Sequence, residues 1–337
     1  MKTLHIYLLC LNYIFIGFIS CDIDKKKHNE KEIIAYVDKQ PIFYNEIDNK
    51  VRQELFDELN RIYIIRKIAL DEAIKDKLLE IESRKFNITK DSLLNKLYKI
   101  KINDASIEKY IKDCRLNGKI PELRKNLLFH DLKSAKGKEL LLENFKEYIL
   151  SQYIDSLKDI YKIEIYLKPP VSPLISLNDL LIHYRGNLNS QTTFLVISDF
   201  DCDMCRKNKH IYDKVFLKYK DKIRFGYTHF GSYVSISAIA SECAANQGMF
   251  WEMHDSIYNL KNIPDTTDLF RIAQNLNMDM QSFKEDFHSK VLYKKIKDNL
   301  HSIELVGIYG TPTILINGKI IFNSASLEEI EKIIDSE

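Results

Sequence analysis

Apolar residues recur at helical spacing through the first half of the chain. From residue 33 onward they follow the three- and four-residue steps of one helix face. Two stripes stand out, formed by Leu55, Phe56, Leu59, Ile62 and Tyr63 and by Ile74, Leu78 and Ile81. Asn45 and Thr89 suit helix N-termini. Helical patterning resumes over 127–157, and residues 163–167 alternate as a short strand does. The pattern predicts packed helices.

The spacing changes after residues 168–173, which hold three of the seven prolines and cannot continue a helix. A β-forming run at 193–197 then leads through a polar turn into an amphipathic helix, and a second strand is expected at 223–230. Helices follow over 233–305, then a hairpin around Asn317-Gly318 and a helix over 327–334. This order predicts an α/β thioredoxin-like fold with a helical insertion, preceded by a mostly α-helical domain.

Composition narrows the class of protein. A chain of 337 residues suggests two domains. Lys plus Arg (50) nearly cancel Asp plus Glu (48), and 45% of residues are hydrophobic, which excludes a disordered chain and a nucleic-acid binder held by bulk charge. With only 10 Gly and 7 Pro, helices are favoured over an all-β sandwich.

The N-terminus has the features of an export signal. Lys2 precedes an almost wholly apolar stretch from Leu4 to Ile19, which is too short and too interrupted for a spanning helix. The small residue before Cys21 resembles the lipobox of bacterial lipoproteins, which implies that Cys21 is acylated. Phe18 departs from the Leu that the pattern prefers, so plain cleavage or a retained anchor stays open. We expect a lipoprotein signal peptide at 1–20 and a tether at 21–32.

Six cysteines are too few to staple a scaffold of this size. Once the signal is removed and Cys21 carries lipid, the remaining thiols are Cys114, Cys202, Cys205 and Cys243. Cys243 is expected to be a small buried hydrophobe within an Ala-rich helix. For Cys114 the same role and a free thiol are both open.

Cys202 and Cys205 form the motif that carries chemistry. At positions i and i+3 on the first turn of a helix, two thiols face the same side and can form a reversible disulfide. Unpaired N–H groups and the helix dipole favour a thiolate at the first position, so we assign Cys202 as nucleophile and Cys205 as the resolving thiol. Half of a zinc site is the competing explanation, but the sequence has no second CxxC or paired His to complete one.

Asp203 and Met204 lie between the cysteines and are expected to tune the reduction potential of the pair. The carboxylate of Asp203 opposes a nearby thiolate. The helix dipole, about 0.3 to 1 kcal/mol, acts in the other direction, as do the cations on the next turns: Arg206, Lys207 and Lys209. Because these effects are similar in size, the oxidase, reductase and isomerase directions all stay open.

Residues 310–313 (Gly-Thr-Pro-Thr) are the second informative segment. Taken alone, Pro312 predicts an ordinary trans proline that opens a hairpin. In a thioredoxin-like context the expectation reverses, because a cis bond brings the backbone of Thr311 beside Cys202 and offers an extended substrate a strand edge. We therefore expect Thr311 and Pro312 to bind substrate.

Four segments of the second half are specific in combination: residues 198–200 leading into the CxxC motif, 247–255 (QGMFWEMHD), 307–313 (GIYGTPT) and 317–318. Together, residues 190–337 resemble the DsbA-like (BdbD-type) branch of the thioredoxin superfamily. The resemblance implies an active-site disulfide between Cys202 and Cys205 and a cis Pro312. Many members carry Pro and then His or Tyr between the cysteines. Asp203 and Met204 replace them, which puts the oxidising strength in doubt rather than the redox role.

The first half has a less specific resemblance. Residues 35–42 (AYVDKQPI), the helices that follow and residues 73–79 (AIKDKLL) are similar to the N-terminal helical domain of SurA-like chaperones. This resemblance covers residues 33–167 and implies a cradle for unfolded chains. A passive spacer or a dimerisation module is equally open.

The expected organisation is a SurA-like helical domain at 33–167, a linker at 168–189 and a DsbA-like thioredoxin domain at 190–337. We predict an extracytoplasmic, membrane-anchored thiol-disulfide oxidoreductase on the periplasmic or cell-surface side. Its expected partners are unfolded or cysteine-containing exported proteins, a possible membrane redox partner and the lipid bilayer, with no cofactor, metal or nucleic acid. The alternative is a holdase chaperone or client-binding lipoprotein with weak or vestigial redox activity.

Overall fold

The computed structural model describes residues 32–117, 130–131 and 133–337. These divide into two compact units, one that combines residues 32–55 with 173–337 and one that spans 56–172. The sequence-based boundaries differ from this division, because they assign residues 33–55 to the helical domain. The expected signal peptide, Cys21 and the tether up to residue 31 lie outside the described residues.

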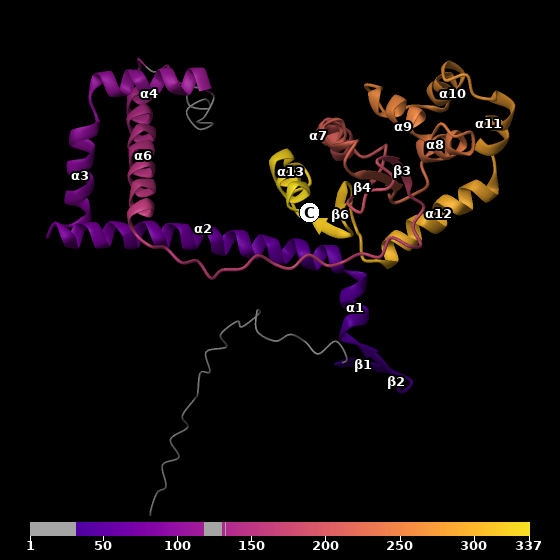
Figure 1. Ribbon diagram of the computed structural model, residues 1–337, viewed down its shortest axis with the longest axis horizontal. Coiled ribbons are helices and arrows are strands. Elements are labelled where there is room, and N and C mark those ends of the chain that lie inside the picture. Colours follow the sequence, from indigo (N-terminus) through magenta and orange to yellow (C-terminus); the bar gives the residue numbers. More distant parts are fainter. Residues whose placement is uncertain (1–31, 118–129, 132) are drawn as a thin grey trace, which may run out of the picture. The chain divides into compact units, whose positions relative to one another are not determined.

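The unit at 56–172 is built from helices. They are α2 (Arg52–Lys85, which begins in the other unit), α3 (Lys90–Lys101), α4 (Asp104–Asn117) and α6 (Ala135–Ile160). Thr89 caps α3, as expected, and its hydroxyl accepts a hydrogen bond from the Ser92 N–H at 3.1 Å. The first half of α6 packs on α3 and α4, and its second half packs on α2 and α3 (Figure 1).

The apolar stripes on α2 are only partly buried, which limits the predicted helix packing to part of each stripe. Phe56 and Leu78 are 6% and 3% exposed, whereas Leu55, Leu59 and Ile81 are 41%, 40% and 37% exposed. The reason is length: a helix of 34 residues presents more apolar surface than its shorter neighbours cover. Residues 163–167, which lie in a described range, form no regular secondary structure, so the predicted strand there is wrong.

The N-terminal part of the other unit starts with a hairpin rather than a helix. Strands β1 (Ile33–Val37) and β2 (Gln40–Phe43) pair antiparallel around Asp38 and Lys39, both at positive φ. The prediction of helical register from residue 33 was wrong, because this β-branched and aromatic run finds a partner strand across a two-residue turn. Helix α1 (Tyr44–Lys50) follows.

A five-stranded sheet forms the centre of this unit, in the order β3-β5-β4-β6-β7. The strands are β3 (His183–Gly186), β4 (Thr193–Ser198), β5 (Arg224–His229), β6 (Thr313–Ile316) and β7 (Lys319–Ile321). β4 and β5 are parallel, and the other neighbours are antiparallel. The predicted hairpin is confirmed, with Asn317 and Gly318 at φ 50° and 78° in its turn.

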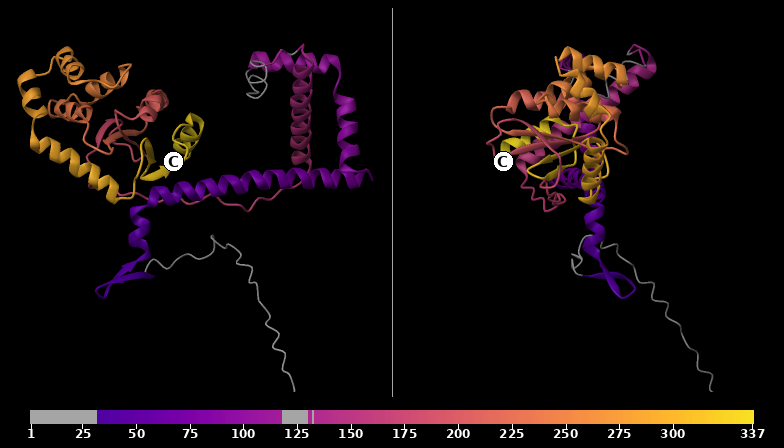
Figure 2. Two further views of the ribbon diagram at one scale, coloured as in Figure 1. Left: turned by 180° about the vertical axis from the view of Figure 1, so that it is seen from behind. Right: turned by 90° about the vertical axis from the view of Figure 1, so that its right-hand side faces the viewer.

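Helices cover both faces of the sheet (Figures 1 and 2). On one face lie α7 (Asp203–Tyr219) and α13 (Leu327–Ser336). The insertion between β5 and β6 packs on the other face and consists of α8 (Ile236–Asn246), α9 (Phe250–Asn259), α10 (Thr266–Asn275), α11 (Met280–Phe287) and α12 (Lys290–Leu305). The thioredoxin-like α/β fold with a helical insertion is therefore confirmed for the C-terminal half, after a mostly helical N-terminal region.

Strand β3 lies inside the segment at 168–189 that the sequence indicated as a linker. Its four residues, His-Tyr-Arg-Gly, show no apolar alternation that could reveal a strand. It forms because the exposed edge of β5 offers a ladder of backbone groups, with which His183 to Gly186 pair in register.

Candidate active site

Cys202 lies where the central strand β4 has just ended and α7 begins. It is the N-cap residue of α7, and its Sγ accepts a hydrogen bond from the Cys205 N–H at 3.4 Å. The Cys202 N–H in turn donates to the Asp199 carbonyl at 3.3 Å, which closes the turn between strand and helix. This position sets the Cys202 sulfur against the backbone N–H groups of the first turn, at the positive end of the helix dipole.

The two thiols of the motif differ in access. Both are free thiols, but Cys202 is partly exposed whereas Cys205 is only 1% exposed. Burial raises the pKa of Cys205 to about 12, so its protonated form dominates at neutral pH. One sulfur can therefore meet a partner in solution while the other is reached only through it.

Thr311 lies directly beside the first thiol. The Thr311–Pro312 peptide bond is cis, as the resemblance implied. The Cys202 Sγ–H donates to the Thr311 carbonyl at 3.6 Å, although the two residues are 109 positions apart. The antiparallel pairing of β4 with β6, in which Ile197 is opposite Thr313, brings them together.

Asp203 and Met204 occupy the exposed first turn of α7. Met204 is 50% exposed and adds an apolar side chain to the surface next to Cys202. Asp203 is an acidic group at the positive end of the helix, where the macrodipole stabilises it.

Phe200 anchors the turn that carries the motif. Its side chain is fully buried, and its ring lies 4.9 Å from that of Tyr258 and 5.5 Å from that of Tyr227. Next to it, burial raises the pKa of Asp199 above its ordinary value. In the sequence, Asp199 and Phe200 entered only through the family resemblance. A single aromatic residue within a polar turn nevertheless indicates a buried anchor.

Gln53 is a residue of the site that sequence reasoning missed. It is 8% exposed, and its side chain donates to the Thr313 hydroxyl at 2.7 Å and accepts from the Tyr309 N–H at 3.0 Å. Its own N–H donates to the Gly307 carbonyl at 3.0 Å. The start of α2 thus holds both ends of the loop at 307–313, across a separation of 260 residues to Thr313. No local pattern marks such a contact.

A cleft of about 880 Å³ opens beside this loop. Thr311 and Asp199 line it near the motif, and the N-terminal segment contributes Lys50. Exposed aromatic side chains also line it, from Tyr233, Tyr293 and Tyr309. The cleft is large enough for several residues of an extended chain.

Among the described residues, Cys243 and the one group of potential metal ligands lie outside the motif. Cys243 is fully buried, as expected, and burial raises its pKa to about 12. The side chain of Cys114 lies outside what the structure describes. Within the described residues, one group of three potential metal ligands occurs, His183, His229 and Glu242, and it includes neither cysteine of the motif.

Comparison with known proteins finds similarity in the C-terminal part of the chain. A family model described as thioredoxin matches residues 181–336. Among solved structures, oxidised BdbD from Bacillus subtilis is 21% identical, covers 49% of this chain and 96% of its own, and has a TM-score of 0.44. The thiol-disulfide exchange protein α-DsbA2 from Wolbachia pipientis is 18% identical, covers 47% and 88%, and has a TM-score of 0.42.

Curated relatives carry a different name. The Na⁺/H⁺ antiporter NhaA of Herminiimonas arsenicoxydans is 28% identical over 172 residues, 50% of this chain and 27% of that protein. NhaA 3 of Salinispora tropica is 29% identical over 142 residues, 41% and 22% of the two chains. The chain thus spans about a quarter of the length of these relatives. In the described ranges, none of the helices has both the length and the apolar character that crossing a membrane requires.

Replacement of Gln53 by Ala should loosen the loop at 307–313. The Tyr309 N–H and the Thr313 hydroxyl lose their partner, at a cost of about 1 to 3 kcal/mol in the free energy of unfolding. Hydrogen exchange read by mass spectrometry should show faster exchange in this loop. Asn60→Ala is the matched control, because Asn60 is also buried on α2 but donates within its own helix, to the Phe56 carbonyl. Equal exchange of the loop in the two variants would contradict the assignment.

Proposed function

We propose that the protein is a thiol-disulfide oxidoreductase that acts on exported proteins through Cys202 and Cys205. The observation that carries the proposal is the division between the two sulfurs: Cys202 is accessible at a helix N-terminus, and Cys205 is buried behind it. Exchange of disulfides needs this asymmetry, because a client must reach one thiol while the other resolves the intermediate.

The reaction proceeds through a mixed disulfide. In the oxidising direction, a client thiolate attacks Sγ of Cys202 in the Cys202–Cys205 disulfide, and Cys205 leaves as a thiolate that takes up a proton. A second client thiolate then attacks the client sulfur of the mixed disulfide, which releases the client disulfide and leaves both protein thiols reduced. The reverse sequence reduces a client, and the relative potentials of protein and client decide the direction.

Thr311 and Pro312 are proposed to hold the client during exchange. The Thr311 carbonyl already lies 3.6 Å from the Cys202 sulfur, so backbone pairing there would place a client cysteine next to it. The adjacent cleft with its tyrosines suits an extended, partly apolar segment. Asp203 and Met204 are proposed to tune the potential from the exposed first turn of α7.

The N-terminal sequence pattern supports a location outside the cytoplasm, where disulfides persist. We propose acylation of Cys21, a membrane anchor and recycling by a membrane redox partner. The helical unit is proposed to hold unfolded clients, and no cofactor takes part.

One observation favours a second function, that of a holdase with weak redox activity. Helix α2 exposes a run of large aliphatic side chains, with Ile64, Ile65 and Ile68 at 41%, 67% and 65% exposure. Such a surface can bind unfolded segments without any thiol chemistry.

Replacement of one cysteine at a time separates the two functions. Cys202→Ser should abolish insulin reduction and dithiol oxidation while leaving aggregation suppression intact, because only the thiol is lost. Cys205→Ser should instead accumulate a mixed disulfide with a cysteine-containing client, visible on a non-reducing gel. Suppression of aggregation by a wild-type protein that shows no exchange would establish the holdase.

The rate at which Cys205 resolves the mixed disulfide should rise with pH. Because burial raises the pKa of Cys205 to about 12, its thiolate fraction, and thus the rate of resolution, should rise about tenfold per pH unit between roughly pH 7 and 9. Release of a fluorescent peptide from a preformed mixed disulfide measures this rate, with Cys205→Ser as the variant that should release none. A plateau below pH 8 would show that Cys205 ionises near neutrality.

Asp203→His should raise the reduction potential of the pair. The change removes an anion and supplies a cation near the thiolate, which stabilises the reduced form by on the order of 10 to 30 mV. Equilibration with glutathione buffers measures the potential. Asp221→His makes the same charge change at an exposed position beyond the far end of α7 and should leave it unchanged. A potential that stays the same or falls in Asp203→His would refute the electrostatic account.

A further inference from the structure

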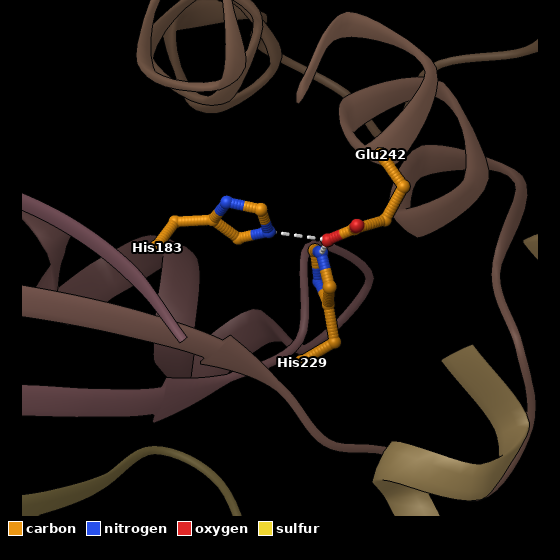
Figure 3. Close-up of side chains that lie close together, drawn as sticks. All are labelled: His183, His229 and Glu242. Atoms are coloured by element: carbon orange, nitrogen blue, oxygen red, sulfur yellow. Dashed lines mark hydrogen bonds and ion pairs between the residues drawn. The ribbon is translucent and has the colours of Figure 1, made fainter. Parts of the chain in front are cut away.

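His183, His229 and Glu242 direct their donor atoms at one another from three separate elements. They come from β3, the end of β5 and α8 (Figure 3). His183 Nε2 lies 2.5 Å and His229 Nε2 lies 3.3 Å from the same carboxylate oxygen, Glu242 Oε1. All three donor atoms lie within 4.8 Å of one another. Glu242 is fully buried and His229 is 3% exposed, so the group lies in the interior.

The second oxygen of the same carboxylate has a partner of its own. Lys295 Nζ donates to Glu242 Oε2 at 3.3 Å from α12. The Oε2 atom of this carboxylate is thus held from outside by Lys295, while its Oε1 atom faces the two imidazoles. Outer partners orient the carboxylate ligands of metal sites in the same way.

The spacing fits a tetrahedral ion with a small adjustment. Ligand bonds of about 2.0 to 2.2 Å place neighbouring donor atoms about 3.4 Å apart around zinc. The separation between His229 and Glu242 already has this value, and that between His183 and Glu242 must widen by less than about 1 Å. His183 can move, because it lies on the edge strand and its side chain is 16% exposed.

Nearby groups support the arrangement. The ring of Phe250 stacks on His183 with centroids 3.6 Å apart, so the imidazole can shift within its own plane while it keeps its orientation. The Ser241 hydroxyl donates its hydrogen to the Ala238 carbonyl at 2.9 Å, and its oxygen lies 3.2 Å from His229 Nε2. Two imidazoles with one carboxylate suit zinc and similar transition metals, whereas magnesium and calcium prefer oxygen ligands alone.

We propose that His183, His229 and Glu242 bind a divalent transition-metal ion of the zinc class, which ties the edge strand β3 and strand β5 to helix α8. The ion stabilises the fold and takes no part in thiol exchange, since neither cysteine of the motif contributes a ligand. The competing account is a closed network in which both imidazoles donate to Glu242 and no ion enters.

Metal titration of the full chain decides between them. The protein is prepared with Cys202→Ser and Cys205→Ser, so that the motif thiols bind no zinc, and is stripped with a chelator before calorimetric titration with Zn²⁺. We expect one tight equivalent and a higher thermal midpoint with zinc than without. Binding of Co²⁺ should give the visible absorption of a tetrahedral site.

Variants locate the bound ion. His183→Ala and Glu242→Gln should each weaken Zn²⁺ binding at least about tenfold. His301→Ala removes a histidine that is 67% exposed and should leave binding unchanged. Circular dichroism identifies any variant that fails to fold, and the titration of the folded parent protein does not depend on that result. Absence of a tight equivalent in the parent protein, or its retention in the folded His183→Ala variant, would overturn the proposal in favour of the closed network.

Discussion

The pairing of β4 with β6 is the constraint on which the active-site geometry depends. Ile197 pairs with Thr313 near the end of β4. The turn that leaves β4 and the loop that enters β6 therefore meet at the same end of these two inner strands. That meeting places the Cys202 sulfur 3.6 Å from the Thr311 carbonyl. Because side chains alternate between faces, a slip of one residue would reverse the faces of the strand and separate the two loops from their supporting helices.

Burial gives the two thiols of the motif different accessibility and therefore different proposed roles. Both belong to the same helical turn, but the N-cap position leaves Cys202 accessible, whereas Cys205 points into the protein and its pKa rises to about 12. The rigid support beneath them comes from buried aromatic rings around Phe200. The asymmetry on which the proposed exchange depends is thus a consequence of where the helix starts relative to the core.

The segment before the thioredoxin-like region contributes to the site as well. The family match begins at residue 181, yet Gln53 holds the loop at 307–313 and Lys50 lines the adjacent cleft. Gly307, at φ 83°, has no Cβ, and an added one would lie 2.3 Å from the Asn49 carbonyl, so the close approach of the two segments requires glycine. The N-terminal segment is therefore part of the functional unit rather than an appendage.

Local features of the sequence determined the fold class and the reactive pair. The strand-turn-helix around Cys202 and Cys205, the hairpin at Asn317-Gly318 and the cap at Thr89 each depend on residues within a few positions, which is the range over which side-chain spacing and backbone preferences act. The strand predicted at 163–167 does not form, because alternation of apolar and polar residues alone does not provide a second strand to pair with. Three features join residues 13 to 260 positions apart: the edge strand β3, the contacts of Gln53 and the convergence of His183, His229 and Glu242. Only the tertiary structure could reveal these contacts, because isolated polar residues without periodicity give no local signal of which distant groups they contact.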